Sequence, residues 1–463
     1  MLTNQGKPSH PMRKIVHRQY PLVSPYIDHP HAEELHGMSE WLEAVPAALV
    51  LVYEDLVRGL RGPQTGRENG LTADQVLRAL VLMRLRNFTY EDLAFHLADS
   101  TTYRTFCRIG IGEKGPSTSA LNRDFKRVRA ETMEAVNCML VHAAVDAGIE
   151  KGRKVRIDCT VTETHIHEPA DSEQLWDCVR VLTRGLHRVR EFTDIAFTDH
   201  TRRAKRRRMG VLNAKNNKAR RKPYVDLLKV TRKTIAAAQR GAAALRAFSS
   251  SDVMEMLAAQ GLADELLHFV GLAHRVVDQT HRRVVLEESV PPQDKVLSIF
   301  EPHTDIIIKK RRETEFGHKL CLTSTVSGLF TDLVVEDGNP ADATLASRMV
   351  ERQRDVYGRV PRQAAFDGGF ASKVNLADIK ALGVKDVCFS KGRGLKVTDM
   401  VKSSWVYRQL RNFRAGVEAG ISFLKRCFGL RRCTWRSLQS FKAYAWSSVV
   451  TANLLILARH TLQ

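Results

Sequence analysis

The sequence predicts an α/β fold in which a mixed β-sheet is flanked by helices. Three observations lead to this prediction. Residues Lys154 to Thr162 alternate between apolar and polar side chains, which indicates a β-strand. Short apolar strands alternate with helical segments from residue 305 onward, as in a sheet covered by helices. The chain is irregular at first and helical from about Met38, and the stretch at about 165–300 is also mostly helical. We therefore expect an all-helical N-terminal domain over 1–150 and a helical, basic insertion.

The charge of the chain points to an anionic partner. Its 463 residues include 72 Lys and Arg against 51 Asp and Glu, which gives a formal net charge of +21. Such an excess usually accompanies a polyanion, because phosphates release counterions when Lys and Arg neutralise them. Nucleic acid is therefore the expected partner, and charge alone leaves a membrane surface open as the alternative.

The cysteines indicate a reducing compartment. The chain has eight of them and no C-x-x-C pair, which argues against a disulfide framework and against a zinc ribbon. The most apolar run, from Ala443 to Ala458, is interrupted by Ser, Thr and Asn residues. We therefore expect a buried core helix there and no membrane span.

Residues 1–150 are expected to bind DNA or to mediate dimerisation. Thr72 and Gln75 form the capping box of one helix, and Thr89 begins another in the same way. A third helix is expected to open near Ser117 and to carry Arg123, Lys126, Arg127 and Arg129. A basic last helix fits a helix-turn-helix reader of DNA, with Lys126 and Arg127 on the phosphates. A small helical bundle with a solvated face fits the same residues equally well.

The insertion at about 165–300 holds the most basic stretch of the chain. Residues 202–222 contain eleven Lys and Arg. In a protein this basic we expect such a run to contact DNA phosphates, while a disordered, solvated loop is the alternative. The candidate DNA-binding residues are Arg206, Arg207, Arg208, Arg220 and Arg221.

Residues 151–463, apart from the insertion, are expected to form the catalytic domain. The first strand is followed by two more that complete a meander, and then helices and strands alternate. The later strands are expected at Asp305 to Ile308, Leu320 to Val326, Leu329 to Val335, Gln363 to Phe366 and Asp386 to Phe389. The helices are expected at about 341–357, 373–382 and 404–428.

Three carboxylates lie where such a fold collects ligands. Asp158 is on the polar face of the first strand, and Asp367 ends a later strand, directly before two glycines that allow close backbone approach. Glu418 lies on the long C-terminal helix, on one stripe with Arg411, Arg414 and Lys425. Carboxylate oxygens suit Mg²⁺, and two such ions about 3.5–4 Å apart can neutralise the entering and leaving oxygens of phosphodiester attack.

At these residues the chain resembles a known family. The pattern R-x₃-E-x₆-K, formed by Arg414, Glu418 and Lys425, looks like that of DDE insertion-sequence transposases with an RNase H-like catalytic core. The segments 157–160 (IDCT) and 367–370 (DGGF) match the family's two aspartate motifs, and 316–319 (FGHK) also resembles the family. The family's fuller signature begins with Tyr, where this chain has Arg411.

The resemblance implies a DNA transposase that cuts strands at the ends of an insertion element and transfers them into target DNA. Asp158, Asp367 and Glu418 would be the catalytic residues and would hold two Mg²⁺ or Mn²⁺ ions. Arg411, Arg414 and Lys425 would contact DNA phosphates near the cut. The implied partners are the terminal inverted repeats, the target DNA and a second copy of the chain, in a bacterial cytoplasm at the nucleoid.

Two other functions remain open at this point. One is a nuclease with an RNase H-like core that cuts DNA without strand transfer. The other is a catalytically inactive DNA-binding protein. The tryptophans Trp405, Trp435 and Trp446 are expected in the core and not as stacking platforms for bases, although Trp435 lies in a basic segment.

Overall fold

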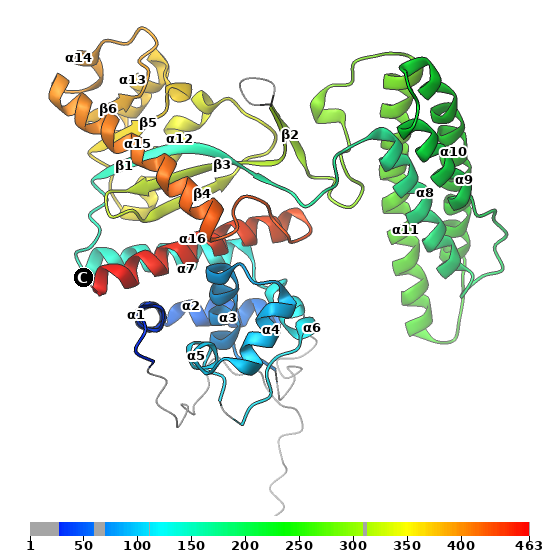
Figure 1. Cartoon of the computed structure of the whole chain (residues 1–463), viewed down its shortest axis with the longest axis horizontal. Helices are drawn as coiled ribbons and strands as arrows, with labels where there is room; N and C mark the ends of the chain where they lie inside the picture. Colours follow the sequence, from blue (N-terminus) through cyan, green and yellow to red (C-terminus); the bar gives the residue numbers. More distant parts are fainter. Residues whose placement is uncertain (1–26, 60–69, 111, 309–312, 463) are drawn as a thin grey trace, which may run out of the picture. The chain divides into compact units, whose positions relative to one another are not determined.

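The computed structural model describes residues 27–59, 70–110, 112–308 and 313–462 (Figure 1). The chain divides into two compact units. The first unit comprises Met1–Glu163 and His318–Gln463, and the second comprises Thr164–Gly317. The mixed sheet with its covering helices confirms the α/β class of the fold.

The helices before the sheet begin where their capping residues predict. Thr72 and Thr89 each cap the backbone N–H three residues later, and each capping box is complete. Ser117 caps the next long helix in the same way, but that helix ends at Phe125, so Lys126, Arg127 and Arg129 are not on it. The described helices are α1 (Pro30–Glu43), α2 (Ala47–Val57), α3 (Ala73–Arg86), α4 (Tyr90–Asp99), α5 (Thr101–Phe106), α6 (Thr118–Phe125) and α7 (Ala130–Asp146).

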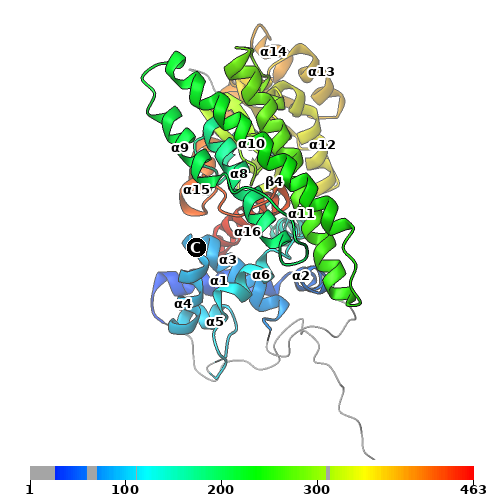
Figure 2. The same ribbon diagram turned by 90° about the vertical axis from the view of Figure 1, so that its right-hand side faces the viewer.

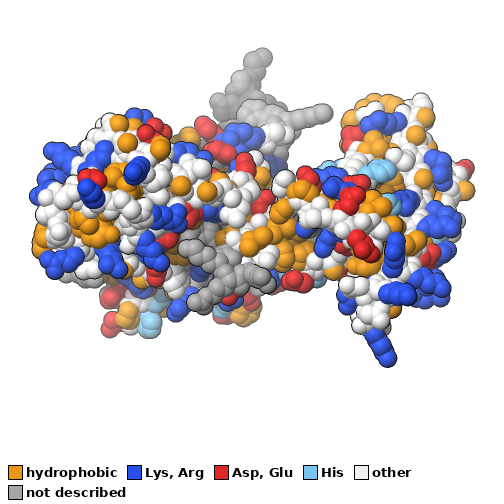
Figure 3. Space-filling model, turned by 90° about the horizontal axis from the view of Figure 1, so that it is seen from above, with side chains coloured by type: hydrophobic (Ala, Val, Ile, Leu, Met, Phe, Trp, Pro, Cys, Tyr) orange, Lys and Arg blue, Asp and Glu red, His pale blue; other side chains and the backbone are white. Residues whose placement is uncertain are grey.

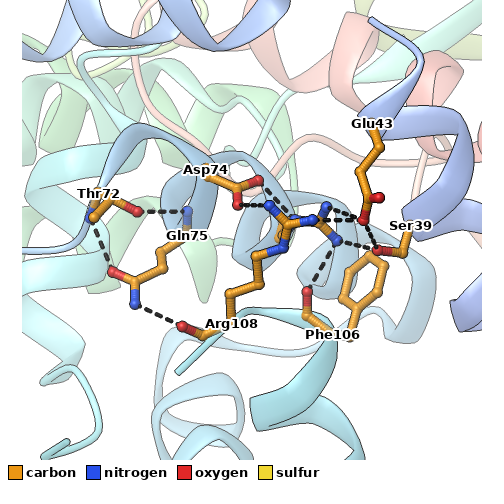
Figure 4. A network of polar contacts seen from close by, with 8 residues as sticks. Ser39, Glu43, Thr72, Asp74, Gln75, Phe106 and Arg108 are labelled. Atoms are coloured by element: carbon orange, nitrogen blue, oxygen red, sulfur yellow. Dashed lines mark hydrogen bonds and ion pairs between the residues drawn. The ribbon is translucent and has the colours of Figure 1, made fainter. Parts of the chain in front are cut away.

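A buried ion network fastens α1 to α3 (Figure 4). Arg78 is almost completely buried, and its Nε donates to Asp74 Oδ1 at 2.6 Å. Arg108 Nη1 donates to the second Asp74 oxygen at 2.8 Å, and Arg108 Nη2 reaches Glu43 on α1. Because every charge in the network has an opposite partner, burial is tolerated here. The network therefore stabilises the helical part of the first unit.

The C-terminal helix α16 (Leu438–Thr461) lies in the hydrophobic core of the first unit, together with residues of the N-terminal helices. It contacts α1, α3 and α7, and Figure 1 shows it beside α7. Among the described residues, α16 is the one helix whose length and composition would allow it to cross a membrane, but 89% of its apolar window is buried in the protein. Asn453 donates to Asn137 on α7 and to the carbonyl of Phe330. The polar side chain of Asn453 on α16 is therefore paired inside the protein, as burial of a polar group in a core helix requires.

The six-stranded sheet has the order β2-β3-β1-β5-β6, with β4 paired to β3. The pairs β1–β5 and β5–β6 are parallel, whereas β2–β3 and β3–β4 are antiparallel. If β2 is left aside, β1, β3 and β4 lie side by side in the sheet in the same order as in the sequence, which is the expected meander. The strands are β1 (Lys154–Glu163), β2 (Asp305–Ile308), β3 (Thr314–Thr325), β4 (Phe330–Val335), β5 (Gln363–Phe366) and β6 (Asp386–Phe389).

Helices on both sides complete a second core around the sheet. It includes Val155 and Ile157 of β1, which lie on the apolar face that strand alternation predicts. The covering helices are α12 (Ala346–Tyr357), α13 (Lys373–Ala381), α14 (Val397–Met400) and α15 (Ser404–Cys427). Two elements differ from the prediction: β3 begins six residues before Leu320, and residues 342–345 form a 3₁₀ turn ahead of α12.

The second unit is a bundle of long helices with its own core (Figure 2). The bundle consists of α8 (Asp171–Val189), α9 (Thr201–Leu212), α10 (Asn217–Arg246) and α11 (Val253–Thr280), and a π-helical turn, His281–Val285, follows α11. The basic run 202–222 forms α9 and the first turns of α10, so the interpretation as a disordered loop is wrong. Ala204 and Val211 fix α9 because they are buried in the bundle while the basic side chains point outward.

Candidate active site

The register of β1 and β5 brings the two aspartates together. The strands pair in parallel, with Ile157 opposite Phe366, and both of these side chains are fully buried in the core. The next residue along each chain is an aspartate, Asp158 on β1 and Asp367 after β5. Because alternate side chains point to opposite faces, both aspartates leave the core on the same side.

The guanidinium of Arg414 on α15 gathers all three candidate carboxylates. Its Nη2 donates to Asp158 Oδ2 at 2.9 Å and lies 3.2 Å from Asp367 Oδ1. Its Nη1 donates to Glu418 Oε1 at 3.1 Å, one turn further along the helix. The side chains of Asp158 and Arg414 are nearly buried, at 14% and 15% exposure, whereas that of Glu418 is 70% exposed. Residues from three distant parts of the chain therefore meet at one point.

The apolar stripe of α15 sets this arrangement. Val417 and Leu424 are fully buried, as is Phe428 directly after the helix, and α15 contacts β1, β5 and β6. Gly416 allows the close approach, because a Cβ there would collide with the guanidinium of Arg156. Arg156 in turn donates to Ser324 Oγ at 2.9 Å and to the carbonyl of Phe413 at 3.0 Å. This helix therefore packs on the sheet.

Asp367 is held in its ionised form. Burial by itself would raise its pKa, but the backbone N–H of Gly368, the Ser390 hydroxyl and the Arg414 guanidinium together lower the pKa below its usual value. The Ser390 Oγ donates to Asp367 Oδ1 at 2.9 Å. A side chain on Gly369 would strike Asp342, so the glycines beside Asp367 are needed for the turn to fit.

The pKa of Asp158 is raised, whereas that of Asp367 is lowered. Burial raises the pKa of this carboxyl to about 6, although Arg414 and the backbone N–H of Cys159 act against the rise. The nearby charge of Asp367 adds to the increase. The two aspartates therefore differ, because Asp158 has lost more solvent than Asp367 and has fewer hydrogen-bond donors.

The donor chemistry of the site suits a hard divalent cation. All three side chains offer carboxylate oxygens, the ligand type that Mg²⁺ and Mn²⁺ prefer. Within the described residues, no three His, Cys, Asp or Glu side chains are grouped closely enough to hold a metal ion as they stand. The position between the carboxylates is taken by the Arg414 guanidinium, whose buried Nε makes no hydrogen bond to a described residue. A cation bound by these acids would therefore have to displace Arg414.

The other cations expected on this helix are placed differently. Arg411 is exposed and Lys425 is half-buried. The assignment of Arg414 to a DNA phosphate stays a prediction, since its guanidinium binds carboxylates in this state.

In the second unit, the arginines of α9 divide into paired and exposed residues. Arg203 and Arg207 both bind the carboxylate of Asp226 at 2.5 Å, and Arg208 pairs with Glu173. Arg206 is exposed, as is Arg220 on α10, and neither forms an ion pair with a described residue. A pocket of about 550 Å³ lies on α10, lined by Lys218, Arg221, Lys222, Val225, Asp226 and Lys229.

In the first unit, the two cations expected to bind DNA phosphates have separate environments. Lys126 is exposed at the end of α6. Arg127 donates to the carbonyl oxygens of Leu56 and Arg58 and so links the segment after α6 to the end of α2. Lys126 therefore faces solvent, whereas Nη1 of Arg127 is used in internal hydrogen bonds.

Some residues of the region escaped the sequence analysis. Ser390 follows β6 and touches Asp367, a contact that only the parallel pairing of β5 and β6 creates. Trp405 is 63% exposed, so its expected place in the core is wrong, whereas Trp435 and Trp446 are buried as expected. The apolar periodicity of α15 gave a usable signal, because Trp405 precedes the buried Val406 and lies outside the apolar stripe.

The comparison with known proteins agrees with the resemblance seen in the sequence. Residues 273–454 match the family described as transposase DDE domain. The match includes Asp367, Glu418 and the whole of α15, and it excludes Asp158, which lies before the helical bundle. No curated protein and no solved structure was found to be similar to the chain. Residues 273–454 are therefore identified as a transposase DDE domain.

Proposed function

We propose that this transposase cuts DNA strands at the ends of an insertion element and joins them to target DNA, with Asp158, Asp367 and Glu418 as the catalytic residues. The observation that carries the proposal is the convergence of these three carboxylates on Arg414. The strand order supports an RNase H-like core, because the first and fourth strands of that core would be β1 and β5, the two that carry the aspartates.

Asp158, Asp367 and Glu418 would hold two Mg²⁺ or Mn²⁺ ions. Bound there, the ions would neutralise charge on the attacking and leaving oxygens of the phosphodiester. The ionised state of Asp367, maintained by Gly368 and Ser390, prepares it for this role. Arg414, released from the carboxylates, would bind a phosphate near the cut together with Lys425 and Arg411.

The basic helices would hold the DNA outside the site. Arg206 and Arg220 are exposed on the second unit, and Arg207, Arg208 and Arg221 add positive charge close by. Lys126, with Arg127 next to it, offers a contact from the helical N-terminal region. We expect a homodimer, because two element ends must be joined in one reaction, and we expect the protein at the bacterial nucleoid.

A strand-transfer assay tests this function. Duplexes with pre-nicked element ends are mixed with a supercoiled target plasmid and Mg²⁺ or Mn²⁺, and the products are separated on a gel. Wild type should give cut and joined products, while Asp367→Asn should give neither and still bind the duplex. Cleavage without joining would favour the nuclease, and wild type that cuts nothing with its own flanking repeats would contradict a catalytic function.

A further inference from the structure

The strands β1 and β3 are neighbours in the sheet, and two contacts set their register. The backbone N–H of Thr164, directly after β1, donates to the carbonyl of Phe316 at 3.0 Å. Nearer the start of β1, Arg156 Nε donates to Ser324 Oγ at 2.9 Å. Residues late in β1 therefore meet residues early in β3, so the two strands are antiparallel.

This register brings two thiols together. Counting inward from either contact places Cys159 directly opposite Cys321. Cys159 is five residues from the hydrogen-bonded Thr164, so it occupies a pair without backbone hydrogen bonds, where the Cα atoms are about 4.5 Å apart. A disulfide needs Cα atoms about 4.4–6.8 Å apart. The two thiols are also hydrogen-bonded to each other. The backbone therefore allows a bond between them.

Burial gives the two thiols different access to solutes. Cys321 is fully buried in the core around the sheet, whereas Cys159 is half-buried and packs against that core. An oxidant can therefore reach only Cys159, and it must be small. Figure 3 shows Lys and Arg side chains spread over the face that it displays. A basic surface retains large anionic oxidants, whereas hydrogen peroxide is small and uncharged.

We propose that Cys159 and Cys321 are a modification site that a peroxide oxidises to a disulfide beside Asp158. The Cys159 sulfur attacks one peroxide oxygen: an S–O bond forms, the O–O bond breaks, and the second oxygen leaves as water with the thiol proton. The Cys321 sulfur then attacks the Cys159 sulfur, and the hydroxyl leaves as water with the Cys321 proton. The two thiols lose two electrons, which reduce one peroxide to two waters.

The resting state of the pair is the dithiol. The hydrogen bond with Cys321 and burial both raise the pKa of the Cys159 thiol. Little thiolate is therefore present at neutral pH, and the thiolate is the reactive form. The pair stays reduced in a reducing compartment and is oxidised when peroxide accumulates.

The disulfide acts on the carboxylate site through the adjacent residue. The backbone N–H of Cys159 donates to Asp158 Oδ1 at 2.8 Å. Opposite Cβ atoms are about 4.5–5.5 Å apart in a sheet, whereas a disulfide holds them at about 3.5–4.5 Å. Its formation therefore draws β1 toward β3 by about 1 Å next to Asp158, and misplacement of that size can reduce a rate about 100-fold. This effect on cleavage rests on the proposed function.

Mass spectrometry of the full chain tests the site without a catalytic readout. The folded protein is treated with hydrogen peroxide, free thiols are alkylated, and the chain is digested without reduction. Wild type should give two peptides joined at Cys159 and Cys321, and dithiothreitol should separate them. Cys159→Ser and Cys321→Ser should give no such link. Cys388→Ser is the matched control and should form the link, because Cys388 is fully buried in the same sheet but lies opposite Ala365.

Cleavage and Mn²⁺ affinity are then compared before and after oxidation. Oxidised wild type should lose about 10- to 100-fold in cleavage rate and regain it with dithiothreitol, whereas Cys321→Ser should keep its rate in peroxide. A pair that stays reduced while the exposed Cys427 is oxidised would overturn the inference. A disulfide that changes neither cleavage nor Mn²⁺ affinity would overturn its link to Asp158. A chain that forms the disulfide but cuts no DNA in either state would contradict the proposed function and leave the modification site in place.

Discussion

The carboxylate site and the basic helix α9 both contain arginine–carboxylate ion pairs, but the ratio of arginines to carboxylates is reversed between them. At the site, one guanidinium, that of Arg414, is shared by three acids. On α9, the single carboxylate of Asp226 is shared by Arg203 and Arg207. The first cluster is left with too few cations and the second with too few anions.

The difference indicates which ligand each region lacks. Carboxylates that outnumber their cation attract a further cation, and the half-buried position of the site strengthens that attraction. Arginines that outnumber their carboxylate, on an exposed helix, attract phosphates. Asp226 is ionised, because the hydrogen bond from Arg203 lowers its pKa to about 2. Arg207 lowers this pKa further, whereas burial acts in the opposite direction.

The largest expected effect is a difference in cleavage rate between two matched aspartate substitutions, one in each region. Asp158→Asn should reduce cleavage by about 10³-fold or more, because it removes a ligand from ions that supply several kcal/mol of charge stabilisation. Asp226→Asn makes the same chemical change in the second unit and should leave the cleavage rate at saturating DNA unchanged. Single-turnover cleavage of a pre-assembled complex measures both rates. Equal losses in the two variants would remove the distinction between the regions.

Removal of the shared guanidinium should be the next largest effect. Arg414→Gln leaves two partly buried carboxylates without their counter-ion, and we expect a loss of about 3 kcal/mol in the free energy of unfolding at pH 7 in EDTA. Mg²⁺ should stabilise this variant more than wild type, since the cation no longer competes with Arg414. Urea unfolding with and without Mg²⁺ gives both values, and the exposed Arg411→Gln is the control. An unchanged stability of Arg414→Gln would contradict the account.

The pH dependence of metal binding should follow Asp158. Its pKa of about 6 lies above the usual value, so protons occupy this carboxyl below pH 6 and compete with a cation. Affinity for Mn²⁺ should be nearly constant above pH 7 and should fall about tenfold per pH unit below pH 6. Isothermal titration at pH 5, 6 and 7 measures the trend. A pH-independent affinity over this range would exclude Asp158 as a ligand.

The smallest effects should come from single arginines of the second unit. Arg206→Gln and Arg220→Gln should each lower the salt slope of DNA binding by about 0.9, because each removes one phosphate contact. Arg203→Gln should instead lower the free energy of unfolding by at most about 1 kcal/mol, as exposed ion pairs contribute little. Salt titrations and urea unfolding on the same three variants distinguish these roles. A reversed pattern would mean that Asp226 does not decide which arginines are available.

Much of the fold followed from local patterns. The strands β2, β5 and β6 have the predicted bounds, and the capping residues Thr72 and Thr89 begin their helices as expected. Asp158 and Asp367 could be selected because strand alternation and a strand end are visible in the sequence. Their proximity depends on the register of β1 with β5, which joins segments about 200 residues apart and has no local signal.

The sequence alone could not predict which arginines form ion pairs with carboxylates. Arg203, Arg206 and Arg207 look alike in a basic run, and only the packing of α9 against α10 brings two of them to Asp226. Arg414 could be placed on the stripe of Glu418, but its bond to Asp158 spans 256 positions. The exposure of Trp405 was missed for a different reason, because tryptophan side chains are on average highly buried.

The central claim is that Asp158, Asp367 and Glu418 together hold divalent cations. Electron paramagnetic resonance of Mn²⁺, titrated into the full chain bound to an element end, tests it directly. The account predicts two bound Mn²⁺ per chain for wild type and fewer for each of Asp158→Asn, Asp367→Asn and Glu418→Gln. A wild type that binds no Mn²⁺, or three variants that bind as much as wild type, would contradict it.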